Sequence, residues 1–165
     1  MNREVVVWNP SRKSREGFIS AFSAGVFLIL IGIIFVAIPG IFDAVLQFFK
    51  DFTIIQVPHV PGFMLPAPSH LANHTTVYSA VMYFSLAWGI FLVGLLMIRI
   101  FARSPLQKKA ENTSDIVFWL ASSFLVTNFL NEDTDIAMWF AFWATIIMLV
   151  GVSLVIRAIV LALFK

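Results

Sequence analysis

Hydrophobic residues gather in four long runs along this chain, with polar segments between them. The runs cover residues 18–38, 77–98, 116–130 and 136–156, and none contains Asp, Glu, Lys, Arg or His. A helix of about 20 apolar residues crosses the roughly 30 Å hydrocarbon layer of a bilayer, because each residue rises about 1.5 Å. The pattern predicts an all-α, polytopic integral membrane protein whose four transmembrane helices form a bundle.

Polar and helix-breaking residues set the expected boundaries within one membrane domain, residues 1–165. The breaker pair Pro39-Gly40 ends the first helix, Ser69 or Asn73 suits the N-cap of the second, and Asp115 suits the start of the third. We expect helices at about 17–38, 75–100, 115–130 and 136–164, joined by an outer segment at 39–74, an inner loop at 101–114 and an outer turn at 131–135.

The third run is the shortest, since residues 116–130 span only about 22 Å as a helix. It also contains four polar residues: Ser122, Ser123, Thr127 and Asn128. A re-entrant loop is the alternative to a full crossing, and it would place the C-terminus on the outer side. The distribution of basic residues favours the full crossing. Within the third helix, we expect Asn128 to form an interhelical hydrogen bond.

Lysine and arginine are distributed very unevenly between the two sides that four crossings define. If the N-terminus is cytoplasmic, ten of the eleven fall inside and only Lys50 falls outside. The inner set is Arg3, Arg12, Lys13, Arg15, Arg99, Arg103, Lys108, Lys109, Arg157 and Lys165. We expect a multi-pass protein of the cell membrane. Because cytoplasmic loops are enriched in lysine and arginine, we expect both of its termini in the cytoplasm. The first run is too long for a cleaved signal peptide and is expected to stay as an anchor.

Composition excludes several classes of function. The chain is 60% hydrophobic, with a net charge of +2 that is too small to indicate a nucleic-acid partner. It has no cysteine, and its apolar runs lack the ionisable residues that ion-coupled transport, haem ligation or intramembrane proteolysis would need. We therefore expect a non-enzymatic protein without a cofactor.

The outer segment 39–74 combines two patterns. Asp43, Gln47 and Lys50 recur on one side of a helix whose other side is apolar, as in helices that lie in the headgroup plane. Four prolines follow, at 58, 61, 66 and 68, and they favour an extended, stiff cap over the outer face.

All three histidines fall in this outer segment. His70 and His74 are four residues apart, a spacing that suits a metal site, and His59 is a third speculative ligand. The alternative is a solvated loop with incidental histidines. Asn73-His74-Thr75 is also a glycosylation sequon on the expected outer side.

Small residues recur at helical spacing in three of the runs. Such residues let membrane helices approach closely, so we expect them to mark helix packing, within one chain or between chains. The positions are Gly25, Gly32, Ala87, Gly94, Ala137, Ala141, Ala144 and Gly151.

These features favour a structural or accessory subunit, or a scaffold, of a membrane assembly. Its expected partners are the lipid bilayer and either further copies of itself or another membrane protein. One alternative is an oligomeric passive pore or small-solute carrier lined by the polar residues of the third helix. The other is a metal-dependent enzyme or redox accessory that uses the outer histidines.

Overall fold

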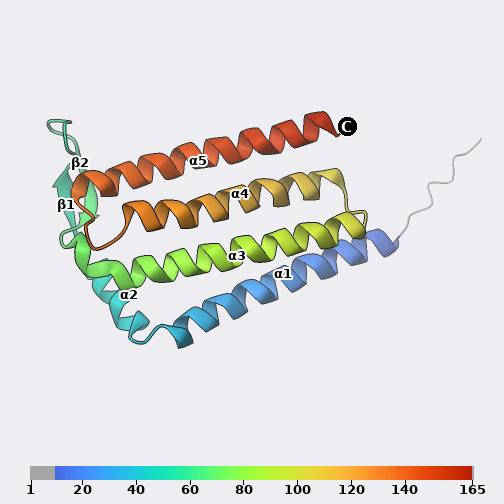
Figure 1. The fold of residues 1–165 in the computed structure, drawn as a ribbon, viewed down its shortest axis with the longest axis horizontal. Helices are drawn as coiled ribbons and strands as arrows, with labels where there is room; N and C mark the ends of the chain where they lie inside the picture. Colours follow the sequence, from blue (N-terminus) through green and yellow to red (C-terminus); the bar gives the residue numbers. More distant parts are fainter. Residues whose placement is uncertain (1–9, 165) are drawn as a thin grey trace, which may run out of the picture.

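The computed structural model describes residues 10–164, most of which are helical (Figure 1). The helices are α1 (Pro10–Ala37), α2 (Ile41–Lys50), α3 (Thr75–Phe101), α4 (Leu106–Phe129) and α5 (Ile136–Leu163). Between α2 and α3 lie β1 (Phe52–Gln56), β2 (Met64–Pro68) and a short 3-10 helix, η1 (Leu71–His74). Of the expected inner cations, Arg3 and Lys165 lie outside the described residues, and the side chains of Arg12, Lys13 and Arg15 are not described.

The four long helices lie side by side in an open row, in the order α1, α3, α4, α5 (Figure 1). α4 packs extensively against both α3 and α5. α1 packs mainly against α3, through Ile19, Phe22 and Phe27. α1 and α5 therefore form the two edges of the row, and most of their surface is not covered by the chain itself.

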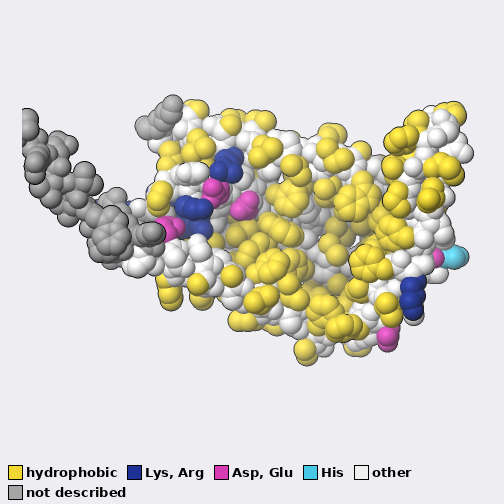
Figure 2. Space-filling model, turned by 180° about the vertical axis from the view of Figure 1, so that it is seen from behind, with side chains coloured by type: hydrophobic (Ala, Val, Ile, Leu, Met, Phe, Trp, Pro, Cys, Tyr) yellow, Lys and Arg dark blue, Asp and Glu magenta, His cyan; other side chains and the backbone are white. Residues whose placement is uncertain are grey.

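Three of these helices are long and apolar enough to cross a membrane: Glu16–Ala37, Leu71–Phe101 and Ile136–Leu163. Figure 2 shows the matching surface, with hydrophobic side chains over the middle of the molecule and charged ones gathered near its two ends. Large apolar side chains such as Leu28, Ile147 and Met148 are more than 60% exposed, which is unfavourable in water and favourable in lipid. The structure therefore agrees with a membrane protein, and α4 is the one long helix that does not meet this standard.

α4 begins much earlier than the sequence predicts. The expected inner loop 101–114 is wrong over most of its length, because only residues 102–105 separate α3 from α4. The turn uses a left-handed residue, Arg103 at φ 51°, and Pro105 then starts the helix, as its fixed φ allows. The polar residues that suggested a loop find partners instead: the Asn112 side chain donates to the Leu92 carbonyl oxygen at 2.7 Å, and Glu111 forms two ion pairs.

The outer segment contains the predicted amphipathic helix and an unpredicted β-hairpin, so the chain is not purely α-helical. α1 ends before Pro39, and Gly40 at φ 71° begins α2. β1 and β2 then pair antiparallel, with Phe52 opposite Pro68. Both strands of this two-stranded sheet are edges, which is where proline is tolerated because a missing N–H group faces outward. The extended conformation was predictable from the prolines, whereas the strand pairing was not.

The best-packed core lies at the end of the row that carries α2 and the hairpin, here called the hairpin end. Tyr78 and Trp139 are each 3% exposed there, and both rings lie against Phe48 of α2. Aromatic residues near the ends of membrane helices commonly anchor in the interface, but these two rings are buried inside the protein. Trp143, one turn further along α5, is exposed. Trp139 and Tyr78 instead attach the amphipathic helix to the ends of α3 and α5.

Candidate functional sites

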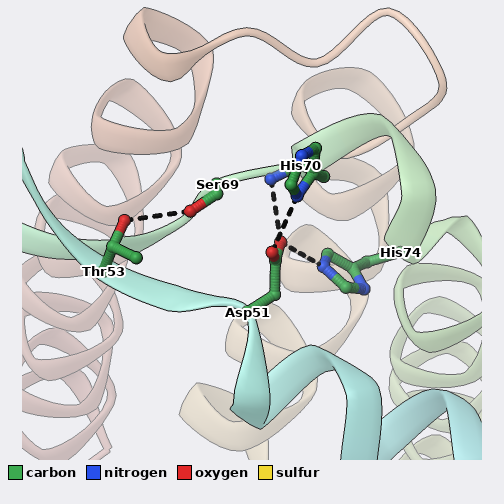
Figure 3. Close-up of polar contacts among 5 residues, drawn as sticks. All are labelled: Asp51, Thr53, Ser69, His70 and His74. Atoms are coloured by element: carbon green, nitrogen blue, oxygen red, sulfur yellow. Dashed lines mark hydrogen bonds and ion pairs between the residues drawn. The ribbon is translucent and has the colours of Figure 1, made fainter.

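A carboxylate held by two histidines joins α2 to the start of α3 (Figure 3). Asp51, which follows the last residue of α2, accepts hydrogen bonds from His70 Nδ1 and from His74 Nε2, both at 2.8 Å. The backbone N–H of His70 donates to the same carboxylate at 2.8 Å. His74 is buried and His70 is exposed, so the cluster lies at the boundary between the core and the surface.

The side-chain hydrogen bond from His70, followed in size of effect by that from His74, holds the pKa of Asp51 well below its usual range, because each stabilises the ionised carboxylate. Nearby, the hydroxyl groups of Thr53 and Ser69 are 3.0 Å apart, and the Ser69 N–H donates to the Asp51 carbonyl oxygen (Figure 3). Together these contacts fasten the end of α2 and the base of the hairpin to the chain that enters α3.

The predicted metal ligands are only partly brought together. His70 and His74 converge on Asp51, but each directs the ring nitrogen nearest the carboxylate into a hydrogen bond. His59 lies in the hairpin loop, and no hydrogen bond joins it to the other two in the described part of the chain. Within residues 10–164, no group of three His, Cys, Asp or Glu side chains is placed to hold a metal ion. The geometry thus fits a structural clamp.

Asn73 does not cap α3. Its backbone N–H donates to the His70 carbonyl oxygen within the turn of η1, and His74 precedes the first residue of α3 without a side-chain cap. Asn73 is exposed, which leaves its sequon accessible for modification if the chain passes a compartment that glycosylates it.

Most of the small residues expected at helix contacts face away from the rest of the chain. Those on α5 are all exposed, and an added Cβ at Gly25, Gly32, Gly94 or Gly151 would meet nothing within 4 Å. Ala87 is half-buried. The exposed positions on α5, here called the α5 stripe, are Ala137, Ala141, Ala144 and Gly151. None of these four mediates a close approach inside this chain.

The close approach occurs at Gly89, which the sequence analysis missed. A Cβ built there would lie 2.5 Å from Leu120 Cδ2, so only glycine lets α3 and α4 pack at this point. Ser123 adds an interhelical hydrogen bond from its hydroxyl to the Met82 carbonyl oxygen at 3.2 Å. Ser85 and Gly89 are small, buried and four residues apart, so they lie on the same face of α3. The sequence alone could not distinguish this face from the one that carries Ala87 and Gly94, because the position of α4 was not known.

The polar residues of α4 do not share one exposed face. Ser122 and Ser123 are buried, whereas Thr127 and Asn128 are exposed. Asn128 donates to the Phe124 carbonyl oxygen of its own helix at 2.7 Å, so the expected interhelical bond from Asn128 is wrong, and Ser123 forms one instead.

Ion pairs connect the helices at the other end of the row. Glu111 contacts Lys108 Nζ at 2.8 Å and Arg157 Nη2 at 2.9 Å, which links α4 to α5. Arg99, 8% exposed, donates to the Lys108 carbonyl oxygen at 2.7 Å and links α3 to α4. The hydrogen bond from Lys108 is the main cause that lowers the pKa of Glu111. These contacts explain why the charged residues at the start of α4 are part of a packed helix and not of a loop.

Comparison with known protein families, characterised proteins and solved structures finds no match to this chain. Its function is therefore argued from its own residues.

Proposed function

We propose that this protein is a non-enzymatic, multi-pass membrane subunit that assembles with further copies of itself through the edges of its helix row. The observation that carries the proposal is the α5 stripe. Four small residues at helical spacing share one exposed side of an edge helix, and the chain itself does not cover them. Between lipid-embedded helices, such small-residue surfaces favour close helix association.

The proposed threading has four crossings and both termini in the cytoplasm. The three apolar helices need a fourth crossing if both ends are to lie on one side. α4 suits that role because α3 and α5 cover two of its sides, so the polar side chains of Asn112 and Ser123 contact protein rather than lipid. Arg99, Arg103, Lys108, Lys109 and Arg157 lie at one end of the row, and Lys50 lies at the other, as the positive-inside rule requires.

The polar clusters of the described residues support a structural role. Asp51 and its histidines fasten α2, and Glu111 and its cations fasten α4 to α5. The hydrogen-bonding groups of both clusters are thereby used in contacts between secondary-structure elements.

Mass measurement in a gentle detergent tests the proposal. We expect the wild-type chain to run as an oligomer, and Ala144→Phe to shift it towards the monomer by filling the α5 stripe. Val150→Phe is the matched control, since Val150 is also exposed but lies about 120° around the helix from Ala144. A wild-type chain that is strictly monomeric and bound to no partner would contradict the proposal.

A further inference from the structure

A groove lined by both polar and apolar side chains lies between the start of α3 and the end of α4, at the hairpin end. Its volume is about 320 Å³. Thr75, Tyr78, Ser79 and Met82 of α3 line one side, and Val126 of α4 and Glu132 of the turn that follows α4 line the other. This groove is separate from the Asp51 clamp and from the α5 stripe.

The chemistry of the groove changes with depth along α3. Thr75 lies at the mouth, Tyr78 and Ser79 lie one turn further in, and Met82 lies one turn beyond them, a total of about 10 Å by helical rise. On α4, the buried Val126 forms part of the apolar floor, while Asn131 and Glu132 follow the last turn at the mouth. A hydroxyl-rich mouth above an apolar floor matches an amphiphile with a polar head and a hydrocarbon chain.

The electrostatics of the mouth favour a cation. No Lys, Arg or His lines the groove, and Glu132 forms no ion pair or hydrogen bond in the part of the chain that is described. The C-terminus of α4 brings the partial negative charge of its dipole to this mouth, and the N-terminus of α3 at Thr75 brings partial positive charge, so the preference for a cation comes from Glu132. A head group that carries N–H donors on a positive nitrogen would therefore find acceptors at the mouth.

The groove wall also contains an unsatisfied donor. Tyr78 is 3% exposed, and its hydroxyl has no hydrogen-bond partner among the described residues. Thr75 and Ser79 lie on the same helix, and their hydroxyls also have no hydrogen-bond partner among the described residues. A buried hydroxyl without a partner is unfavourable, and phosphate or ester oxygens of a bound molecule would accept from these groups.

We propose that this groove binds a phospholipid whose head group carries a primary ammonium, such as phosphatidylethanolamine. Glu132 accepts hydrogen bonds from the ammonium, the hydroxyls of Tyr78 and Ser79 donate to the phosphate and ester oxygens, and Met82 and Val126 contact the acyl chain. The proposal rests on the membrane location proposed above but not on self-assembly, since all lining residues come from one chain.

Native mass spectrometry of the detergent-purified full chain, titrated with single lipids, tests this assignment. We expect phosphatidylethanolamine to bind about fivefold more tightly than phosphatidylcholine, because only the primary ammonium has N–H groups that can donate hydrogen bonds to Glu132, and one hydrogen bond contributes about that much. Anionic phosphatidylglycerol should bind no better than phosphatidylcholine. The same spectra show monomers and oligomers separately, so failure of lipid binding and failure of assembly are distinguishable.

Variants assign the preference to the groove. Glu132→Gln should remove the difference between the two zwitterionic lipids, and Asp133→Asn, the same charge change one residue away from the lining, should preserve it. Tyr78→Phe should weaken both lipids severalfold and leave the difference intact. Equal binding of the two lipids by the wild type, or equal effects of Glu132→Gln and Asp133→Asn, would overturn the proposal. Competition by phosphoethanolamine alone at lipid-like concentrations would identify a soluble amine and also overturn it.

Discussion

At the scale of single residues, Asp51 joins several elements of the fold through hydrogen bonds. Its side chain accepts three hydrogen bonds, and its carbonyl oxygen accepts a fourth from Ser69. It lies at the junction of α2, the hairpin and η1, so one carboxylate sets the orientation of the amphipathic helix relative to α3. Its neighbours in sequence give no sign of this, because its partners are 19 and 23 residues away.

Asp51→Asn should destabilise the protein by about 1–3 kcal/mol at pH 7, because an amide accepts fewer of these hydrogen bonds. The folded-state pKa of Asp51 lies below its unfolded value, so its contribution is complete above about pH 4 and is lost as the pH falls further. Thermal unfolding in detergent should therefore show a difference between the proteins that shrinks below pH 4. Asp43→Asn, on the polar face of the same helix, should have little effect at any pH. A constant difference down to pH 2 would contradict this account.

Gly89→Val should destabilise the protein by about 1–3 kcal/mol, because the new side chain overlaps Leu120. Leu120→Ala in the same molecule should recover part of the loss, which a double-mutant cycle would measure. Gly94→Ala provides the comparison, since it meets no atom within 4 Å and gains up to about 1 kcal/mol of helix propensity. Equal effects at the two glycines would show that Gly89 is not the contact point.

At the scale of elements, the amphipathic helix α2 has three faces. Ile41 and Phe48 point into the core, Asp43 and Gln47 lie on the polar side, and a second apolar strip remains exposed. That strip consists of Phe42, Leu46 and Phe49, each more than half exposed. A helix that packs on protein with one face and still shows a second apolar face fits a location at the lipid boundary.

Amide hydrogen exchange tests the early start of α4. Residues 110–115 should exchange slowly, like the interior of a helix, whereas a loop would exchange quickly. Glu111→Gln should increase their exchange, because it weakens both ion pairs that connect this turn to its surroundings. Asp115→Asn is the control, since Asp115 has no hydrogen bond or ion pair with the described residues. Fast exchange of residues 110–115 in the wild type would indicate that this segment is a loop and not the start of α4.

The elements that the sequence predicts well are those whose signal is local. The apolar runs predict α1, α3 and α5 because a charge-free stretch of that length has few alternatives. The hairpin and the first turns of α4 depend on distant partners: Phe52 pairs with Pro68, and Asn112 bonds to Leu92. The histidine pair was identifiable from its spacing, but its partner Asp51 was not, since a carboxylate after a helix end is common in loops.

At the scale of the whole molecule, the number of crossings decides on which side each cluster lies. The row arrangement places the 102–105 turn and the 131–135 turn at opposite ends of α4. If α4 crosses, the Asp51 clamp and the lipid groove share the outer side, and the Glu111 cluster lies inside.

The absence of natural cysteine makes this directly measurable. Single substitutions Asp133→Cys and Lys109→Cys, probed in intact cells with a membrane-impermeant maleimide, should label only at position 133. Ser69→Cys should label with it, because the hairpin end is outside in the proposed threading. Labelling of positions 109 and 133 from the same side would show that α4 does not cross.

The limited attachment of α1 has its own consequence. Phe27 is the furthest residue along α1 whose ring lies against α3, and a turn at Pro39-Gly40 joins α1 to α2. The remainder, with α3, α4 and α5, keeps its interhelical hydrogen bonds and the Glu111 ion pairs without it. Residues 39–165 should thus insert and fold when α1 is supplied as a separate polypeptide, and co-purification of the two pieces would show that they reassociate.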